Sequence, residues 1–138
     1  MKQISLGAVS RVLCLGAHSD DIEIGAGGTL LKLAEKADDL EICWVVFSAP
    51  GVRADEARLS ADDFLSGIGR KQIKIGSFRE SYFPSEWPSI KEWLEEIKVN
   101  FVPDIVFTHY RDDRHQDHRN REGPVLENPQ IDDRLRER

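Results

Sequence analysis

Short apolar runs alternate with segments of helical periodicity along this chain of 138 residues, and this alternation constrains the fold more than any other feature. The apolar runs are too short for helices and are bounded by polar or turn residues, so each of them predicts a strand. The predicted strands are residues 12–15, 40–47, 72–75 and 104–109. Apolar residues at helical spacing predict helices over residues 29–37, 57–68 and 90–101. Strands that alternate with helices are typical of βαβ units, so we expect an α/β fold with a mostly parallel sheet.

The segment before the last predicted helix has no period. Residues 77–88 contain two prolines and several aromatic side chains, and we expect them to form a loop. Such a loop either covers an edge of the core or walls a pocket. Ser89 is then the expected cap of the helix that follows.

The first predicted strand ends at a cluster of ionisable side chains. His18, Asp20 and Asp21 follow the apolar run, and the glycines at 25, 27 and 28 lead into the first helix, so the segment predicts a strand, a loop and a helix. Ligands of open α/β sheets bind outside the carboxyl ends of the strands. This loop therefore occupies a position typical of a site.

The fourth predicted strand ends at a second cluster, which begins with His109. Further histidines and aspartates follow it; they are Asp112, Asp113, His115, Asp117 and His118. If the first and fourth strands run parallel, both clusters lie at the same edge of the sheet and can meet. His109 itself ends a strand, and its position is equally consistent with a structural and with a pocket-lining role.

The two clusters together predict a metal site. Catalytic zinc usually takes three protein ligands, and His18, Asp21 and the distant His118 would satisfy that number. Imidazole and carboxylate ligands favour zinc, although iron, manganese or cobalt would also suit them. The expected cofactor is therefore Zn²⁺, or another divalent metal.

Three further residues are candidates for proton transfer. Asp20 is a candidate general base, because a metal lowers the pKa of bound water to around 7 and a carboxylate then needs only to accept a proton. His115, when protonated, is a candidate for stabilising an oxyanion or protonating a leaving amine. Asp117 is a candidate for orienting that imidazole.

Composition excludes some classes of function. Nineteen Lys and Arg against 25 Asp and Glu give a net charge of -6, and the basic residues form no stripe, which disfavours nucleic-acid binding. Cys14 and Cys43 each lie in an apolar run and are expected to be small buried hydrophobes. The longest apolar stretch, residues 42–47, is far shorter than the ~20 residues that span a bilayer. We expect a cytoplasmic protein that acts on a small molecule, without nucleic acid or membrane as partner.

The stretch Ala17–Leu30, followed far downstream by His115–Arg119, resembles the PIG-L/LmbE-like deacetylases. That resemblance implies a Rossmann-like three-layer α/β/α fold and a usually zinc-dependent hydrolase that removes acetyl groups from N-acetylglucosamine-containing compounds. The matching motif positions are His18, Asp21 and His118 as metal ligands, Asp20 as general base, His115 as transition-state stabiliser and Asp117 as its partner. Arg53, in an Arg-x-x-Glu pattern with Glu56, resembles an arginine that lies near the substrate sugar.

Two departures from the family pattern stand out. Ser19 occupies a position where the family usually has proline, a change that involves no side-chain chemistry. The stretch 120–138 is polar and interrupted by prolines, whereas the family normally continues its sheet there. We expect a deacetylase domain over residues 1–119, a polar tail over 120–138, and the C-terminal part of the family fold to be missing.

Two alternatives remain open. One is a truncated, catalytically weak or inactive relative that acts as a binding or interaction module and completes its sheet with another chain, for example as a homo-oligomer. The other is a mononucleotide-binding domain, which rests on architecture alone. The glycines at 25, 27 and 28 form neither a Gly-x-Gly-x-x-Gly nor a Walker pattern, so they do not favour phosphate binding.

Overall fold

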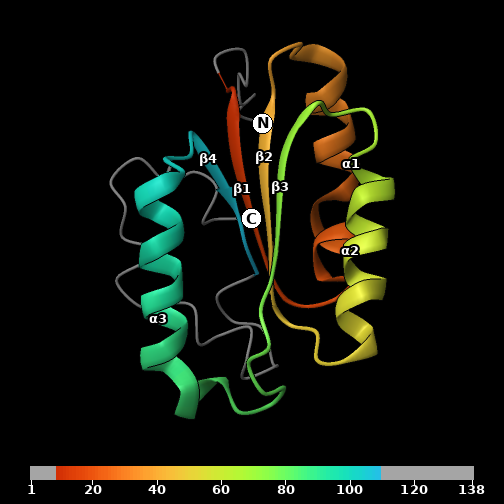
Figure 1. The fold of residues 1–138 in the computed structure, drawn as a ribbon. Coiled ribbons are helices and arrows are strands. Elements are labelled where there is room, and N and C mark those ends of the chain that lie inside the picture. The colour runs from red at the N-terminus through yellow and green to blue at the C-terminus, as the bar shows by residue number, and fades with distance from the viewer. Residues whose placement is uncertain (1–8, 110–138) are drawn as a thin grey trace, which may run out of the picture.

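The computed structural model describes residues 9–109, and within them strands and helices alternate strictly (Figure 1). In chain order the elements are β1 (Arg11–His18), α1 (Asp21–Lys36), β2 (Glu41–Ser48), α2 (Val52–Phe64), β3 (Arg70–Ile75), α3 (Phe83–Asn100) and β4 (Ile105–Phe107). All four predicted strands and all three predicted helices are present, with shifted ends. The predicted tail over residues 120–138 lies outside the described residues.

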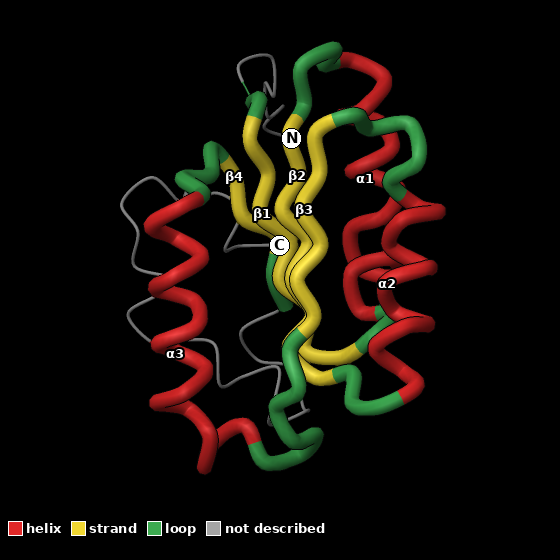
Figure 2. The backbone as a smooth tube through the Cα atoms, in the orientation of Figure 1, coloured by secondary structure: helices red, strands yellow, loops and turns green. Residues whose placement is uncertain are grey.

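The strands form one parallel sheet in the order β3-β2-β1-β4 (Figure 2). Val12 of β1 pairs with Ile42 of β2 on one side and with Ile105 of β4 on the other. The strand order reverses at β1, and such a reversal is the point where open α/β sheets bind ligands. The carboxyl ends of β1 and β4 are therefore neighbours, as the sequence predicts.

Helices cover both faces of this sheet, with α1 and α2 on one side and α3 on the other (Figure 1). Alternate residues of β1 supply the two cores. Val12 and Cys14 pack in the cluster under α1 and α2, while Leu13 and Leu15 pack in the cluster under α3. Burial on both faces explains why the strands are continuous apolar runs rather than alternating ones. The fold is the expected three-layer α/β/α arrangement.

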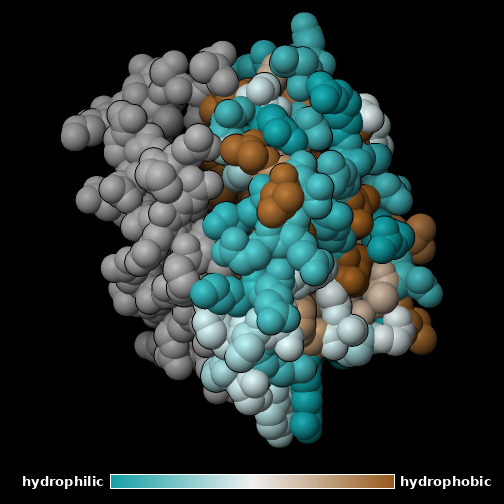
Figure 3. All heavy atoms as spheres, turned by 60° about the vertical axis from the view of Figure 1, so that its left-hand side comes forward, coloured by the Kyte–Doolittle hydropathy of each residue, from teal (hydrophilic) through white to brown (hydrophobic). Residues whose placement is uncertain are grey.

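The outer surface is largely hydrophilic on the face shown in Figure 3, where apolar side chains are scattered among polar ones. This pattern is typical of amphipathic helices that bury one side against a sheet. Within residues 9–109, none of the helices combines the length and the apolarity needed to cross a bilayer.

The predicted loop over residues 77–88 is wrong in its second half. The helix α3 begins at Phe83, Pro84 lies in its first turn, and Pro88 lies inside it. Proline is tolerated in the first turn because the N–H that it lacks has no helical acceptor there. Ser89, the predicted cap, is consequently an interior residue of α3, and the position before the helix is Tyr82.

The predicted loop before the first helix is also too long. The helix α1 begins at Asp21, so the glycines at 25, 27 and 28 lie within it. Gly27 is buried against α2, and a Cβ atom at this position would lie 2.9 Å from the Cζ atom of Phe64. At least one of these glycines therefore serves the close approach of two helices rather than a turn.

Candidate active site

His18 and Asp21 lie together at the carboxyl end of β1. His18 is the last residue of the strand and Asp21 the first residue of α1. The Asp21 Oδ2 atom accepts the backbone N–H of His18 at 2.8 Å and lies 3.6 Å from His18 Nδ1. Both side chains are partly buried. The tight turn thus places the first two predicted metal ligands side by side.

Asp20 has different surroundings from its neighbour Asp21. Its backbone adopts a left-handed conformation with φ 79°, which is uncommon for any residue other than glycine. Asp20 is exposed, and its side chain makes no capping hydrogen bond to α1. The turn therefore binds one carboxylate to the protein and presents the other at the surface.

His109, two residues after β4, joins this cluster from a distance of 92 residues along the chain. Its Nε2 atom accepts the backbone N–H of Ala17 at 2.9 Å and lies 3.2 Å from Asp21 Oδ2, and its imidazole is 13% exposed. His109 thus connects the carboxyl end of β1 with Asp21 at the start of α1.

Glu23 lies in the first turn of α1, next to the turn 18–21. The Ser60 hydroxyl of α2 donates to Glu23 Oε2 at 3.4 Å, a contact between the two helices. Burial of the half-buried Glu23 carboxyl raises its pKa, and the charge of Asp20 adds to this effect.

Phe83 forms the third side of the cluster. The first residue of α3 is 2% exposed, and its ring centroid lies 5.9 Å from that of His18. The aromatic segment before the last helix therefore covers the core and also contacts a site residue. An imidazole packed on a ring has fewer orientations available, which favours a fixed ligand geometry.

Arg53 lies at the same end of the molecule, in the first turn of α2. Its guanidinium is 3.6 Å from Glu80, and both side chains are well exposed. The contact with Glu80 does not bring Arg53 into the His18–Asp21 cluster. Its contact with a substrate stays a prediction. His115, Asp117 and His118 lie outside the described residues.

The described residues fit part of a metal centre. His18 and Asp21 present a nitrogen and an oxygen donor at the same place, and this mixed donor set suits zinc or a similar divalent ion. No group of three or more His, Cys, Asp and Glu side chains suited to holding a metal is found within residues 9–109. A complete centre would need a further ligand, and the predicted third ligand, His118, lies outside the described residues.

Comparison with known proteins gives matches over most of the chain. The PIG-L family model, described as GlcNAc-PI de-N-acetylase, matches residues 13–126. The uncharacterized deacetylase YaiS of Escherichia coli (strain K12) is 31% identical over 115 residues, which cover 78% of this chain and 61% of that protein.

Two solved structures are similar in fold. The N,N'-diacetylchitobiose deacetylase from Pyrococcus horikoshii, complexed with its inhibitor MPG, has a TM-score of 0.65 at 24% identity; the match covers 83% of this chain and 47% of that one. The conserved protein TT1542 from Thermus thermophilus has a TM-score of 0.57 at 23% identity, covering 79% and 50%. The chain thus spans about half to three fifths of the length of these relatives.

Proposed function

We propose that this chain, which belongs to the PIG-L family of GlcNAc-PI de-N-acetylases, is a metal-dependent hydrolase that removes an acetyl group from an N-acetylated sugar of the N-acetylglucosamine type. One observation carries the proposal. At the carboxyl end of β1, the turn 18–21 binds Asp21 beside His18 and leaves Asp20 exposed, so two adjacent carboxylates have separate tasks. A metal ligand must be fixed in place, as Asp21 is, whereas a general base must be accessible to water, as Asp20 is.

The residues of this chain would divide the reaction as follows. His18, Asp21 and His118 would hold the metal, and Zn²⁺ bound there would polarise the acyl carbonyl and lower the pKa of water. Asp20 would take the proton from the attacking water. His115, oriented by Asp117, would stabilise the oxyanion and protonate the leaving amine. Arg53 would contact the sugar from the first turn of α2. Acetate and the free amine are the products.

The decisive test combines metal analysis with an assay of acetate release. Purified chain should bind about one zinc ion per molecule, and His18→Ala and Asp21→Ala should lose it. With N-acetylglucosamine and chitooligosaccharide substrates, wild type should release acetate and lose this activity in chelator. Undiminished zinc binding by both variants, or turnover that resists chelation, would contradict the proposal.

The second candidate function is a binding module, and it is favoured by the position of β4 at an edge of the described sheet. Within residues 9–109, the three-residue β4 lies at one edge of the sheet and pairs with β1 alone. A strand from another copy of the chain would extend the sheet at such an edge. The mass of the chain in solution separates the candidates: a monomer that turns over substrate excludes the module, and an inactive dimer supports it.

We also propose that the chain is located in the cytoplasm. Cys14 and Cys43 are both free thiols buried in the sheet, and they belong to the clusters on opposite faces of it. Unpaired buried thiols suit the reducing cytoplasm that we propose for this chain. A reporter fusion in cells would test this location.

A further inference from the structure

We infer that His109 is a positioning residue that fixes Asp21 where β1 and β4 separate, an inference that rests on the proposed role of Asp21 as metal ligand. The motif match assigns no role to His109, and the sequence alone leaves a structural and a pocket-lining role equally open. Two contacts of one ring nitrogen point to a role in the site. The Ala17 N–H donates to His109 Nε2 at 2.9 Å, and Asp21 Oδ2 lies 3.2 Å from the same atom.

The strands β1 and β4 pair over only part of their course. Their register ends at the pair Cys14 and Phe107, where β4 itself ends. The strand β1 continues to His18, which still pairs with Ser48 of β2. Within residues 9–109, the end of β1 therefore has a strand neighbour on the β2 side alone. Buried backbone groups that face the other side there need partners of another kind.

His109 supplies such a partner with its side chain. The imidazole Nε2 accepts the Ala17 N–H, a group that a backbone carbonyl of the next strand would accept if the ladder continued. The imidazole is only 13% exposed, so water is a poor substitute for it. The end of β1, which carries His18, is therefore tied to the chain that follows β4 by this ring.

The same ring contacts the Asp21 carboxylate. Asp21 Oδ2 accepts the His18 N–H at 2.8 Å and lies 3.2 Å from His109 Nε2. Its two neighbours come from parts of the chain that are far apart in sequence, and both belong to the carboxyl end of the sheet. A ligand side chain that is already fixed loses less freedom when the metal binds, and this raises the affinity. His109 thus acts on the metal site through Asp21.

A merely structural histidine makes a different prediction from a positioning residue. If His109 served only to pair the Ala17 N–H, its loss would lower stability and leave the zinc affinity of the folded protein unchanged. If it also positions Asp21, its loss lowers that affinity as well. Glutamine is the conservative replacement, because its amide oxygen accepts an N–H and its side chain places a polar atom at a similar distance from the backbone.

The experiment compares the zinc affinities of His109→Ala and His109→Gln, and uses Ile97→Val as the control for lost stability. Ile97 is 3% exposed and lies in the last turn of α3, whereas the first residue of α3 contacts His18. We expect His109→Ala to lower zinc affinity about 10- to 100-fold. His109→Gln should be close to wild type, and Ile97→Val should lower Tm without lowering zinc affinity. Unchanged zinc affinity in His109→Ala, or an equal loss in Ile97→Val, would overturn the inference.

A readout independent of activity separates this inference from the proposed function. Amide hydrogen exchange of the Ala17 N–H should be faster in His109→Ala than in wild type, and should stay slow in His109→Gln. If wild type released no acetate, the proposed activity would fail, whereas zinc affinity and amide exchange would still test the role of His109. Unchanged exchange of the Ala17 N–H in His109→Ala would refute that role even in an active enzyme.

Discussion

The two ends of the sheet use aspartates in opposite ways. At the amino end, Asp104 accepts the backbone N–H groups of Ser10 and Arg11 at 2.9 and 2.8 Å, and the Ser10 hydroxyl at 3.2 Å. At the carboxyl end, Asp20 is exposed and makes no capping bond, although it stands at a helix start where aspartate commonly caps. The Asp104 carboxylate accepts backbone hydrogen bonds and so stabilises the fold. The Asp20 carboxylate makes no capping hydrogen bond and is therefore available for catalysis in the proposed reaction.

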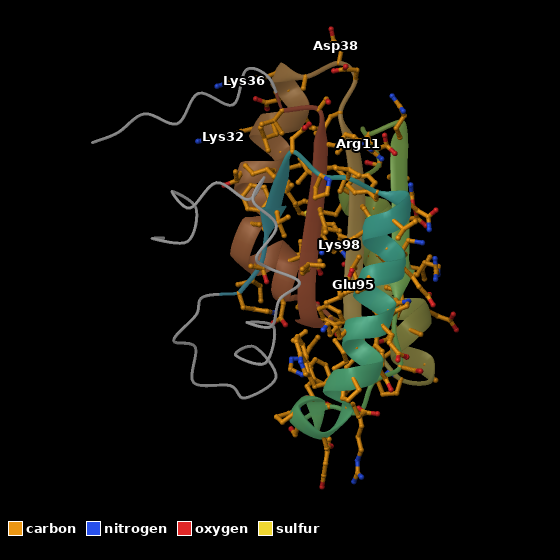
Figure 4. The ribbon with its side chains drawn as sticks, turned by 90° about the vertical axis from the view of Figure 1, so that its left-hand side faces the viewer. Arg11, Lys32, Lys36, Asp38, Glu95 and Lys98 are labelled. Carbon is orange, nitrogen blue, oxygen red and sulfur yellow. The ribbon has the colours of Figure 1, made fainter. Side chains whose placement is uncertain are left out.

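Charge is also distributed differently at the two ends. At the amino end, Glu41 lies between Arg11 and Arg70, at 3.6 and 3.2 Å, and the Arg11 guanidinium lies 4.4 Å from the ring centroid of Phe101. Figure 4 shows Arg11 at the end of the sheet where the strands begin. Opposite charges compensate one another there.

At the carboxyl end, acids gather around the turn 18–21. Asp20, Asp21 and Glu23 fall within one turn of the backbone, beside two imidazoles. A concentration of one sign creates a local field that attracts cations. Acidic residues that are paired with the backbone or with arginines thus anchor the fold at the amino end, whereas those gathered at the carboxyl end form the candidate site.

The largest expected effect comes from Asp20→Asn at the site end. Loss of the proposed general base should lower kcat by about 10²- to 10⁴-fold. Zinc content should match wild type, because Asp21 and His18 keep their mutual contacts. Acetate release and metal analysis on the same preparation measure both quantities. Normal turnover by Asp20→Asn would show that Asp20 is not the general base, and its contrast with the structural Asp104 would then have no catalytic meaning.

The next effect concerns His109, which lies beside Asp21 at the carboxyl end of β1. His109→Ala removes the acceptor of the Ala17 N–H and the imidazole beside Asp21. We expect zinc affinity to fall about 10- to 100-fold, the range typical of residues that orient metal ligands. A competition titration with a zinc chelator gives the affinity. Asp104→Ala is the control, and equal zinc affinities in both variants would place His109 among the purely structural residues.

Much of the fold was predictable because its signals are local. Buried parallel strands appear as short apolar runs, and their alternation with helices leaves few topologies. The pairing of His18 with Asp21 was equally accessible, since a strand that ends directly before a helix brings residues three apart together. The pairing requires only the sequence of one βα unit, and the topology requires only the order of such units along the chain.

The remaining features depend on contacts across the chain. The start of α3 was missed because Pro84 and Pro88 oppose a helix by local propensity, whereas burial of Phe83 in the core favours it. His109 stayed undecided because its partner Ala17 is 92 residues away. The left-handed backbone of Asp20 was not predicted, because no local composition indicates a positive φ at an aspartate.

A smaller effect is expected at the amino end of the sheet. Asp104→Ala deprives Ser10 and Arg11 of their N–H acceptor, and water replaces it in part because Asp104 is exposed. The free energy of unfolding should fall by about 1 kcal/mol, measured by urea denaturation. Zinc affinity and kcat of the folded protein should be unchanged. If Asp104→Ala lost activity and kept its stability, Asp104 would serve the activity of the protein rather than the stability of its fold.

The smallest expected effect is the pH dependence of the stabilisation that Asp104 provides. Burial alone would raise the pKa of Asp104, but the N–H groups of Ser10 and Arg11, the Ser10 hydroxyl and the Arg11 charge outweigh it and lower the pKa below its usual 3.8. Because the folded value is the lower one, the stabilisation is fully present above the unfolded value and is lost as the pH falls through the folded value. The stability difference between wild type and Asp104→Ala should thus be constant near neutrality and shrink below about pH 4.

The matched control for this titration is Asp38→Ala, an exposed acid at the same end of the molecule (Figure 4). It removes the same charge without removing a backbone acceptor, so it reports the effect of net charge alone. Urea denaturation of both variants and wild type at a series of pH values isolates the contribution of the Asp104 hydrogen bonds. The same pH dependence in both variants would show that charge, and not the bonds to Ser10 and Arg11, accounts for the stabilisation at the amino end.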